Sequence, residues 1–236
     1  MVVMIGGLAS CGGGGASSET AGATVNLEAR ITPTVNATVV NSEGTQITLS
    51  KAYLAIWSVE LNALCTDPAF VLLPRHLLEL LIPTAQAHAE STPTKLGVPH
   101  VFDLLDAAAS TRVLGTLNPA VGSYCGLTVE LIRADSDAVG LPRDLNMVNR
   151  LVYLSGSWRR DDGEDIPFEI DLSKSGVPAK RVLRPSLVLS ARNLSATIGI
   201  AIDSARWFDG LDFTQLDTTI QQDLLLQNIR ASISTF

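Results

Sequence analysis

The sequence predicts a mainly β protein, an antiparallel β-sandwich with a leucine-rich excursion and a C-terminal helix. Short apolar–polar alternations recur along the chain, and turns rich in Gly, Pro, Asn and Asp separate them. Alternation with period two is typical of half-buried strands, and closely spaced strands with such turns are typical of sandwiches. Apolar residues make up 46% of the 236 residues, so residues 24–236 can form a single domain with a sizeable core.

The first strands are expected from about residue 24. Residues 25–31 alternate apolar and polar side chains, which is the pattern of a half-buried strand. Residues 35–40 and 46–49 flank the sequence Asn-Ser-Glu-Gly and so predict a hairpin. Residues 51–61 carry apolar side chains on both parities at their start, which predicts a central strand that is buried there on both faces.

Further strands are expected in the second half of the chain. Residues 123–131 follow an Asn-Pro turn and alternate well. Residues 151–158 and 166–172 bracket Asp-Asp-Gly-Glu, and Asp-Gly is a strong hairpin signal. Residues 183–189 and 196–202 are joined by a short polar segment, so we expect them to pair with each other.

Two segments depart from the strand pattern. Residues 70–89 are rich in leucine without period two, which indicates a helix or a long excursion. Near the C-terminus, Thr214 and Asp217 resemble a capping box and predict a helix that begins there. Apolar residues of that helix drift from one face to another, which predicts an interruption or burial on two sides.

The segment Leu-Ala-Ser-Cys at residues 8–11, followed by four glycines, resembles a bacterial lipobox. We therefore expect residues 1–11 to be a truncated lipoprotein signal, Cys11 to be lipidated, and residues 12–23 to be a flexible tether. No Lys or Arg precedes Cys11, which fits a signal that starts upstream of residue 1. The alternative is an N-terminus that contains a cysteine without lipidation.

Lipidation at Cys11 would place the domain in the bacterial cell envelope. Asp directly after a lipidated cysteine is associated with inner-membrane retention, and this chain has Gly12 there. We therefore expect the domain to be attached to the outer membrane and to face the periplasm or the cell surface. In that oxidising environment Cys65 and Cys125 form an even pair and predict a disulfide. The alternative is two buried thiols that behave as small apolar side chains.

Charge and motifs exclude several classes of function. A net charge of −7 with scattered Lys and Arg argues against a nucleic-acid partner, which needs clustered cations. No segment after residue 11 has the roughly 18 uninterrupted apolar residues of a spanning helix, so the expected membrane attachment is the N-terminal lipid alone. Because the sequence has no nucleophile elbow, phosphate loop or zinc-protease motif, we expect a protein that is not an enzyme.

Candidate ligands for a metal are three histidines, His76, His88 and His100. Imidazoles can complete a copper or zinc site, although twelve-residue spacing fits neither a helix face nor a strand face. The alternative is histidines in loops with local hydrogen bonds. No other cofactor is indicated.

Two acidic groups are candidate sites. The carboxylates at 161–165 could bind a hard cation, but the spacing of an EF-hand is absent and a charged hairpin tip explains them better. Asp203, Asp209 and Asp212 could act as paired acids. We expect them instead to cap turns before the terminal helix, with aromatic packing beneath.

Four segments, taken in order, are similar to a known group of proteins. These are the strand at 52–65 that ends in cysteine, residues 119–131, the Leu-Pro-Arg-Asp-Leu-Asn segment at 141–146, and the strand that ends in Gly-Ser-Trp at 156–158. Together they resemble bacterial periplasmic lipoproteins related to the methanobactin-associated periplasmic protein MbnP.

The resemblance implies a β-sandwich and, in the MbnP branch, copper handling, but the three histidines lie outside the similar segments. The sequence as a whole favours a lipid-anchored, non-catalytic binding or envelope-assembly module whose partner is a protein or a small ligand. The alternative is a periplasmic protein that binds copper or zinc.

Overall fold

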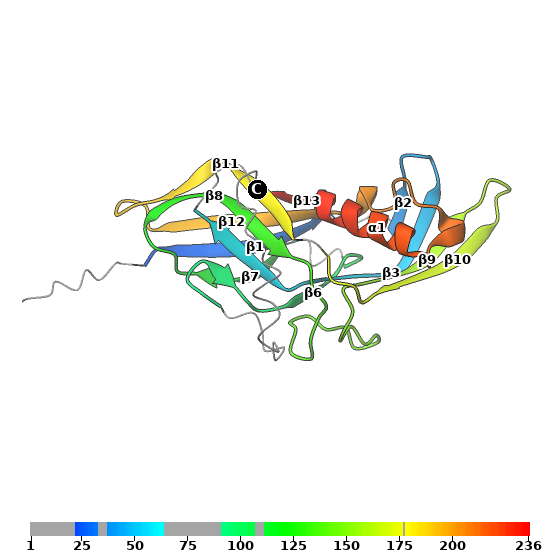
Figure 1. Ribbon diagram of the computed structural model, residues 1–236, viewed down its shortest axis with the longest axis horizontal. Coiled ribbons are helices and arrows are strands. Elements are labelled where there is room, and N and C mark those ends of the chain that lie inside the picture. Colours follow the sequence, from blue (N-terminus) through cyan, green and yellow to red (C-terminus); the bar gives the residue numbers. More distant parts are fainter. Residues whose placement is uncertain (1–21, 33–36, 64–90, 107–110, 177) are drawn as a thin grey trace, which may run out of the picture.

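A computed structural model describes residues 22–32, 37–63, 91–106, 111–176 and 178–236. Strands dominate this part of the chain, and one α-helix lies near its C-terminus (Figure 1). The strands are β1 (Thr24–Thr32), β2 (Thr38–Val40), β3 (Gln46–Ile56), β4 (Ser58–Asn62), β5 (Lys95–Leu96), β6 (His100–Asp103), β7 (Thr111–Leu117), β8 (Gly122–Glu130), β9 (Val152–Arg159), β10 (Asp165–Leu172), β11 (Ala179–Leu189), β12 (Ser195–Asp203) and β13 (Ile233–Thr235). The helical elements are the 3₁₀ turns η5 (Ser204–Arg206) and η6 (Phe213–Gln215) and the helix α1 (Thr219–Ser232).

The described strands form three sheets. The β12 sheet has the order β13-β12-β1-β7, the β8 sheet has the order β11-β8-β4-β5, and the β9 sheet has the order β10-β9-β3-β2, with β6 also paired to β3. These pairings are antiparallel except that of β1 with β12, which is parallel. The predicted mainly antiparallel β fold with a C-terminal helix is therefore confirmed.

The β12 and β8 sheets form the sandwich. Their edges meet on both sides, because β5 contacts β7 and β11 contacts β13. The β9 sheet extends the molecule lengthwise, with β2, β9 and β10 at the far end from β8 and β11 (Figure 1). One chain segment links the two parts, since β3 belongs to the β9 sheet and β4, directly after Trp57, belongs to the β8 sheet.

The strands predicted in the first half of the chain are confirmed with other boundaries. β2 covers residues 38–40 of the segment predicted at 35–40, of which residues 35 and 36 lie outside the described part, and the segments predicted at 46–49 and 51–61 form β3 and β4, which divide at Trp57. The turn between β2 and β3 is closed by the Asn41 side chain, whose Oδ1 accepts a 2.7 Å hydrogen bond from the Thr45 amide. Gly44 in this turn has a φ of +87°, a conformation that favours glycine. Residues 52–56 are all buried, so the central strand is covered on both faces where it was predicted to be.

The predicted strand at 123–131 is β8, and the predicted hairpin around Asp-Gly joins β9 to β10. Two backbone hydrogen bonds close the hairpin turn, from Arg160 to Glu164 and from Gly163 to Arg160, each 2.9 Å long. Gly163 has a φ of +89°. The local turn sequence thus determines this hairpin.

The predicted pairing of residues 183–189 with 196–202 is wrong. β11 and β12 are bonded only at their shared turn, where Ser190 and Asn193 exchange backbone hydrogen bonds of 3.0 and 2.9 Å. Beyond the turn β11 pairs with β8 and β12 pairs with β1. A bulge separates the strands, because residues 183–186 of β11 lie between the pairs Val182–Gly126 and Leu187–Tyr124. Pro185 in this bulge has no N–H to donate to a ladder.

The helix prediction is confirmed, but its cap is not Thr214. The N-cap of α1 is Thr218, whose side chain accepts a hydrogen bond from the Gln221 amide. Thr214 lies in η6, because Asp212 accepts 2.9 and 2.6 Å bonds from its amide and hydroxyl. No interruption lies within α1, which is continuous from Thr219 to Ser232 and buries Leu225, Leu226 and Ile229. β13 follows directly after the helix.

Polar contacts fix α1 against the segment that precedes it. Trp207 is fully buried, and its indole N–H donates a 2.8 Å bond to Ser232 Oγ. The Asn228 side chain donates to the carbonyls of Trp207 and Asp209 at 3.0 and 2.8 Å. Burying an aromatic or aliphatic side chain of this size stabilises a fold by about 1.5–3 kcal/mol. The helix is therefore a rigid element on which side chains can be positioned.

Candidate functional site

Several of the predicted site residues lie outside the part of the chain that the structure describes. These are Cys11, Cys65, His76 and His88. Lipidation, the disulfide and the three-histidine metal site therefore stay predictions. Cys125 and His100 are described, and their surroundings bear on two of these predictions.

Cys125 lies in β8 opposite the bulge of β11. Its Sγ is 3.7 Å from the carbonyl oxygen of Asn62 and 3.6 Å from that of Ala63. Ala63 is two residues before Cys65, and one residue spans at most about 3.6 Å. The end of β4 thus brings the chain close to Cys125 just ahead of the other cysteine.

His100 lies in β6 and is 5% exposed. Its ring stacks on Phe102, with centroids 6.2 Å apart, and neither ring nitrogen has a hydrogen-bond partner among the described residues. Burial lowers the pKa of His100, and the positive charge of Arg112 lowers it further. No group of three His, Cys, Asp or Glu side chains in the described part of the chain is arranged to hold a metal ion.

The acidic segments have structural partners. At the β9–β10 turn Arg160 pairs with Asp162 at 2.5 Å and with Glu164 at 2.6 Å, and Arg159 pairs with Asp165 at 2.9 Å. The charged hairpin tip is thus confirmed.

The aspartates near Trp207 are also structural. Asp203 and Asp212 cap η5 and η6, and Asp209 accepts a 2.8 Å bond from the Ser42 amide. The predicted turn-capping role is confirmed for Asp203 and Asp212, whereas Asp209 instead binds the turn between β2 and β3.

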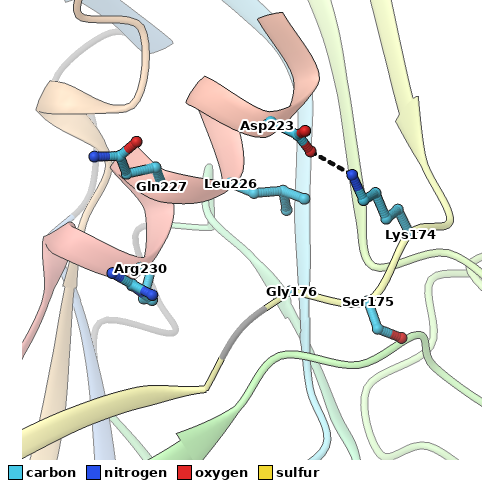
Figure 2. Close-up of a pocket in the computed structure, with 7 residues that line it drawn as sticks. All are labelled: Lys174, Ser175, Gly176, Asp223, Leu226, Gln227 and Arg230. Carbon is cyan, nitrogen blue, oxygen red and sulfur yellow. Dashed lines mark hydrogen bonds and ion pairs between the residues drawn. The ribbon is translucent and has the colours of Figure 1, made fainter. Parts of the chain in front are cut away.

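Sequence reasoning missed a groove between α1 and the segment that follows β10. Figure 2 shows side chains of the helix on one side and the 174–176 segment on the other, around a cavity of about 380 Å³. The helix contributes residues at positions i, i+3, i+4 and i+7, which share one face. The lining residues are Lys174, Ser175, Gly176, Asp223, Leu226, Gln227 and Arg230.

Two contacts hold the non-helical side of the groove. The Gly176 amide donates a 2.8 Å bond to the Leu131 carbonyl. Lys174 Nζ lies 2.5 Å from Asp223 Oδ1 and so links this segment to α1 (Figure 2). Because these two side chains are 54% and 52% exposed, the ion pair contributes little stability and can be exchanged for another partner.

Arg181 of β11 fixes the helical side of the groove. Its guanidinium donates to the carbonyls of Arg230, Ala231 and Ile233, which are groups that a helix leaves unsatisfied at its C-terminal end. Burial lowers the pKa of Arg181, and the neighbouring charge of Arg230 adds to this. The last turn of α1 is therefore held in place by a side chain of β11.

Arg230 is the residue of the groove with the clearest capacity to bind. It is half-buried, and its guanidinium has no carboxylate partner among the described residues. A guanidinium forms two parallel hydrogen bonds with a carboxylate or a phosphate. Lys174 also lines the groove, and Asp223, the carboxylate in its lining, is already paired with Lys174. The groove therefore favours an anionic group.

The comparisons with known proteins add no relative. No family model, curated protein or solved structure matches the chain. In the described residues no helix is both long and apolar enough to cross a membrane.

Proposed function

We propose that this protein is a lipid-anchored module of the bacterial cell envelope that binds an anionic ligand or partner group without catalysing a reaction. The observation that carries the binding role is the groove beside α1, in which Arg230 has no carboxylate partner among the described residues. A rigid helix on one side and a tethered segment on the other support a preformed site. The ligand class is a small molecule or peptide that carries a carboxylate or phosphate.

The binding proposal is tested by thermal unfolding in the presence of two probes, inorganic phosphate and citrate. We expect at least one probe to raise the melting temperature of the wild type, because a ligand that binds only the folded state stabilises it. Arg230→Met should lose the response, whereas Arg192→Met, an exposed arginine in the β11–β12 turn, should keep it. Absence of any response in the wild type, or an equal response in R230M, contradicts the proposal.

The anchor is proposed to be acyl chains on Cys11, with residues 12–23 as the tether. The lipobox-like sequence supports it, and each buried CH₂ of a lipid chain contributes about 0.8 kcal/mol to membrane binding. Gly12 favours attachment to the outer membrane. The test is metabolic labelling with a palmitate analogue, with partitioning into detergent. Cys11→Ala should abolish both, Ser17→Ala should leave both intact, and partitioning that survives C11A excludes this anchor.

A disulfide between Cys65 and Cys125 belongs to the same proposal, since it needs an oxidising compartment. The position of Cys125 beside the backbone of Asn62 and Ala63 supports it. A bridge requires Cα atoms about 4.4–6.8 Å apart, and the two residues from Ala63 to Cys65 can span this distance. Mass spectrometry of the non-reduced peptides tests the pairing directly.

A further inference from the structure

A second cavity lies where β11 and β12 diverge. The two strands leave their shared turn at Ser190 and Asn193 and then enter different sheets. The gap between them has a volume of about 420 Å³. β13 fills the gap at one end, and the C-terminus lies beside β11 in Figure 1. We call this gap the β11–β12 slot; it shares no lining residue with the groove beside α1.

The β12 edge that faces the slot has unpaired backbone groups. Gly199 and Phe236 exchange two backbone hydrogen bonds of 3.2 Å, so Gly199 directs its N–H and C=O toward β13. The β1–β12 register has no shift along its length, and alternate residues of a strand direct their backbone groups to the same edge. Ser195 and Thr197 therefore direct theirs to this edge as well. β13 stops before them, and no backbone group in the described chain bonds to them there.

The slot walls suit an extended chain. Leu183, Leu187 and Ile198 line it with apolar surface, and Phe236 is also among its lining residues. Val188, also in its lining, is 58% exposed. A strand in this position would direct alternate side chains against those walls. The N–H and C=O groups on its β12 side would form hydrogen bonds with the backbone of β12.

We propose that the β11–β12 slot receives an extended peptide segment of a partner protein, which adds to β12 in antiparallel orientation and in line with β13. β13 already shows that this edge accepts an antiparallel strand. Main-chain hydrogen bonds give affinity in such strand addition, and side-chain pockets give specificity. Ser195 and Thr197 offer two N–H and two C=O groups that have no partner in the described part of the chain, and these match a segment of about four residues.

The chemistry of the segment follows from the slot. Apolar side chains at alternate positions fit Leu183, Leu187 and Ile198. An acidic residue at one end fits Arg184, which lines the slot and has no ion pair among the described residues. A free segment fits better than the sheet edge of a second copy, because residues of both β11 and β12 line the slot.

The experiment uses fluorescein-labelled peptides of the form Asp-Xaa-Thr-Xaa-Thr-Xaa and its reverse, with Val, Leu or Phe at Xaa, and measures fluorescence anisotropy. We expect at least one peptide to bind the full protein. N-methylation of its alternate amides should weaken binding about tenfold or more, since it removes main-chain donors. This control needs no change in the protein.

Protein variants locate the binding. Thr197→Pro removes the N–H that faces the slot, at an edge position where proline is tolerated, and should weaken binding about tenfold, whereas Thr197→Val should not. Arg184→Glu should reverse the preference from Asp-ended to Lys-ended peptides. The proposal is overturned if no peptide binds, if N-methylated peptides bind equally, or if T197P abolishes instead a concentration-dependent dimer. None of these outcomes depends on the groove beside α1.

Discussion

Replacement of His100 by Phe should make the stability of the protein less sensitive to acid. The imidazole is buried in β6, it stacks on Phe102, and neither nitrogen is hydrogen-bonded to the described residues. Arg112 places its guanidinium 5.3 Å from the Phe102 ring and close enough to His100 to oppose a second positive charge. The backbone of Leu114 acts in the opposite direction but has the weakest influence of the three on this pKa. A protonated imidazole is therefore disfavoured here.

The sign and size of the effect follow from linkage. Burial places the pKa of His100 below the 6.5 of an ordinary histidine, so between these two values the unfolded chain binds a proton that the folded chain does not. The free energy of unfolding then decreases as the pH falls below 6.5, and it stops decreasing below the folded-state pKa. The contribution of one group is at most about 1.4 kcal/mol for each pH unit.

Urea denaturation of the wild type and His100→Phe at pH 7, 6 and 5 measures this effect. We expect the variant to lose less free energy of unfolding than the wild type as the pH falls. Phe keeps an aromatic ring against Phe102 and removes the titrating group. His76 and His88 are present in both proteins, so their contributions cancel. Parallel stability curves between pH 7 and pH 5 would refute the argument.

Three further predictions concern stability. Arg181→Met should lower the free energy of unfolding by about 1–3 kcal/mol and speed amide hydrogen exchange in the last turn of α1, because helix carbonyls lose their donor. Reduction of a Cys65–Cys125 bridge should cost about 4 kcal/mol, and unfolded oxidised protein should show no thiol labelling at either cysteine. Gly156→Ala should lower the free energy of unfolding by about 1–3 kcal/mol, which calorimetry detects as a fall in melting temperature of about 2–4 °C for each kcal/mol. Gly199→Ala should lower the melting temperature clearly less.

The hairpins could be predicted because their signals are local. Asn41 closes its turn with its own side chain, and Gly163 supplies a positive φ within four residues. The partner of β12 could not be predicted in the same way. It depends on β1, which is far away in the sequence, and on the bulge that turns β11 toward β8. The three residues of β13 are too few to show a period.

The candidate site residues show the same difference between local and long-range signals. The capping roles of Asp203 and Asp212 are visible in sequence because a capping side chain bonds to an amide two residues away. The groove is not visible, because Lys174 and Arg230 come from segments that only the packing of α1 brings together. A charge in the last helical turn, such as that of Arg230, is the one local hint, and it equally suits the helix dipole.

The two glycine substitutions show why local sequence does not reveal the cost of a change. A Cβ at Gly156 would lie 2.0 Å from the Thr48 carbonyl oxygen, and a Cβ at Gly199 would lie 2.0 Å from the Phe236 ring. The overlaps are equal, but the neighbours differ. Thr48 belongs to the backbone of β3, which is paired on both sides, so relief requires two strands to separate. The Phe236 ring is 40% exposed and can rotate away, at the cost of its contact with Arg30. The response of the neighbour therefore decides the stability.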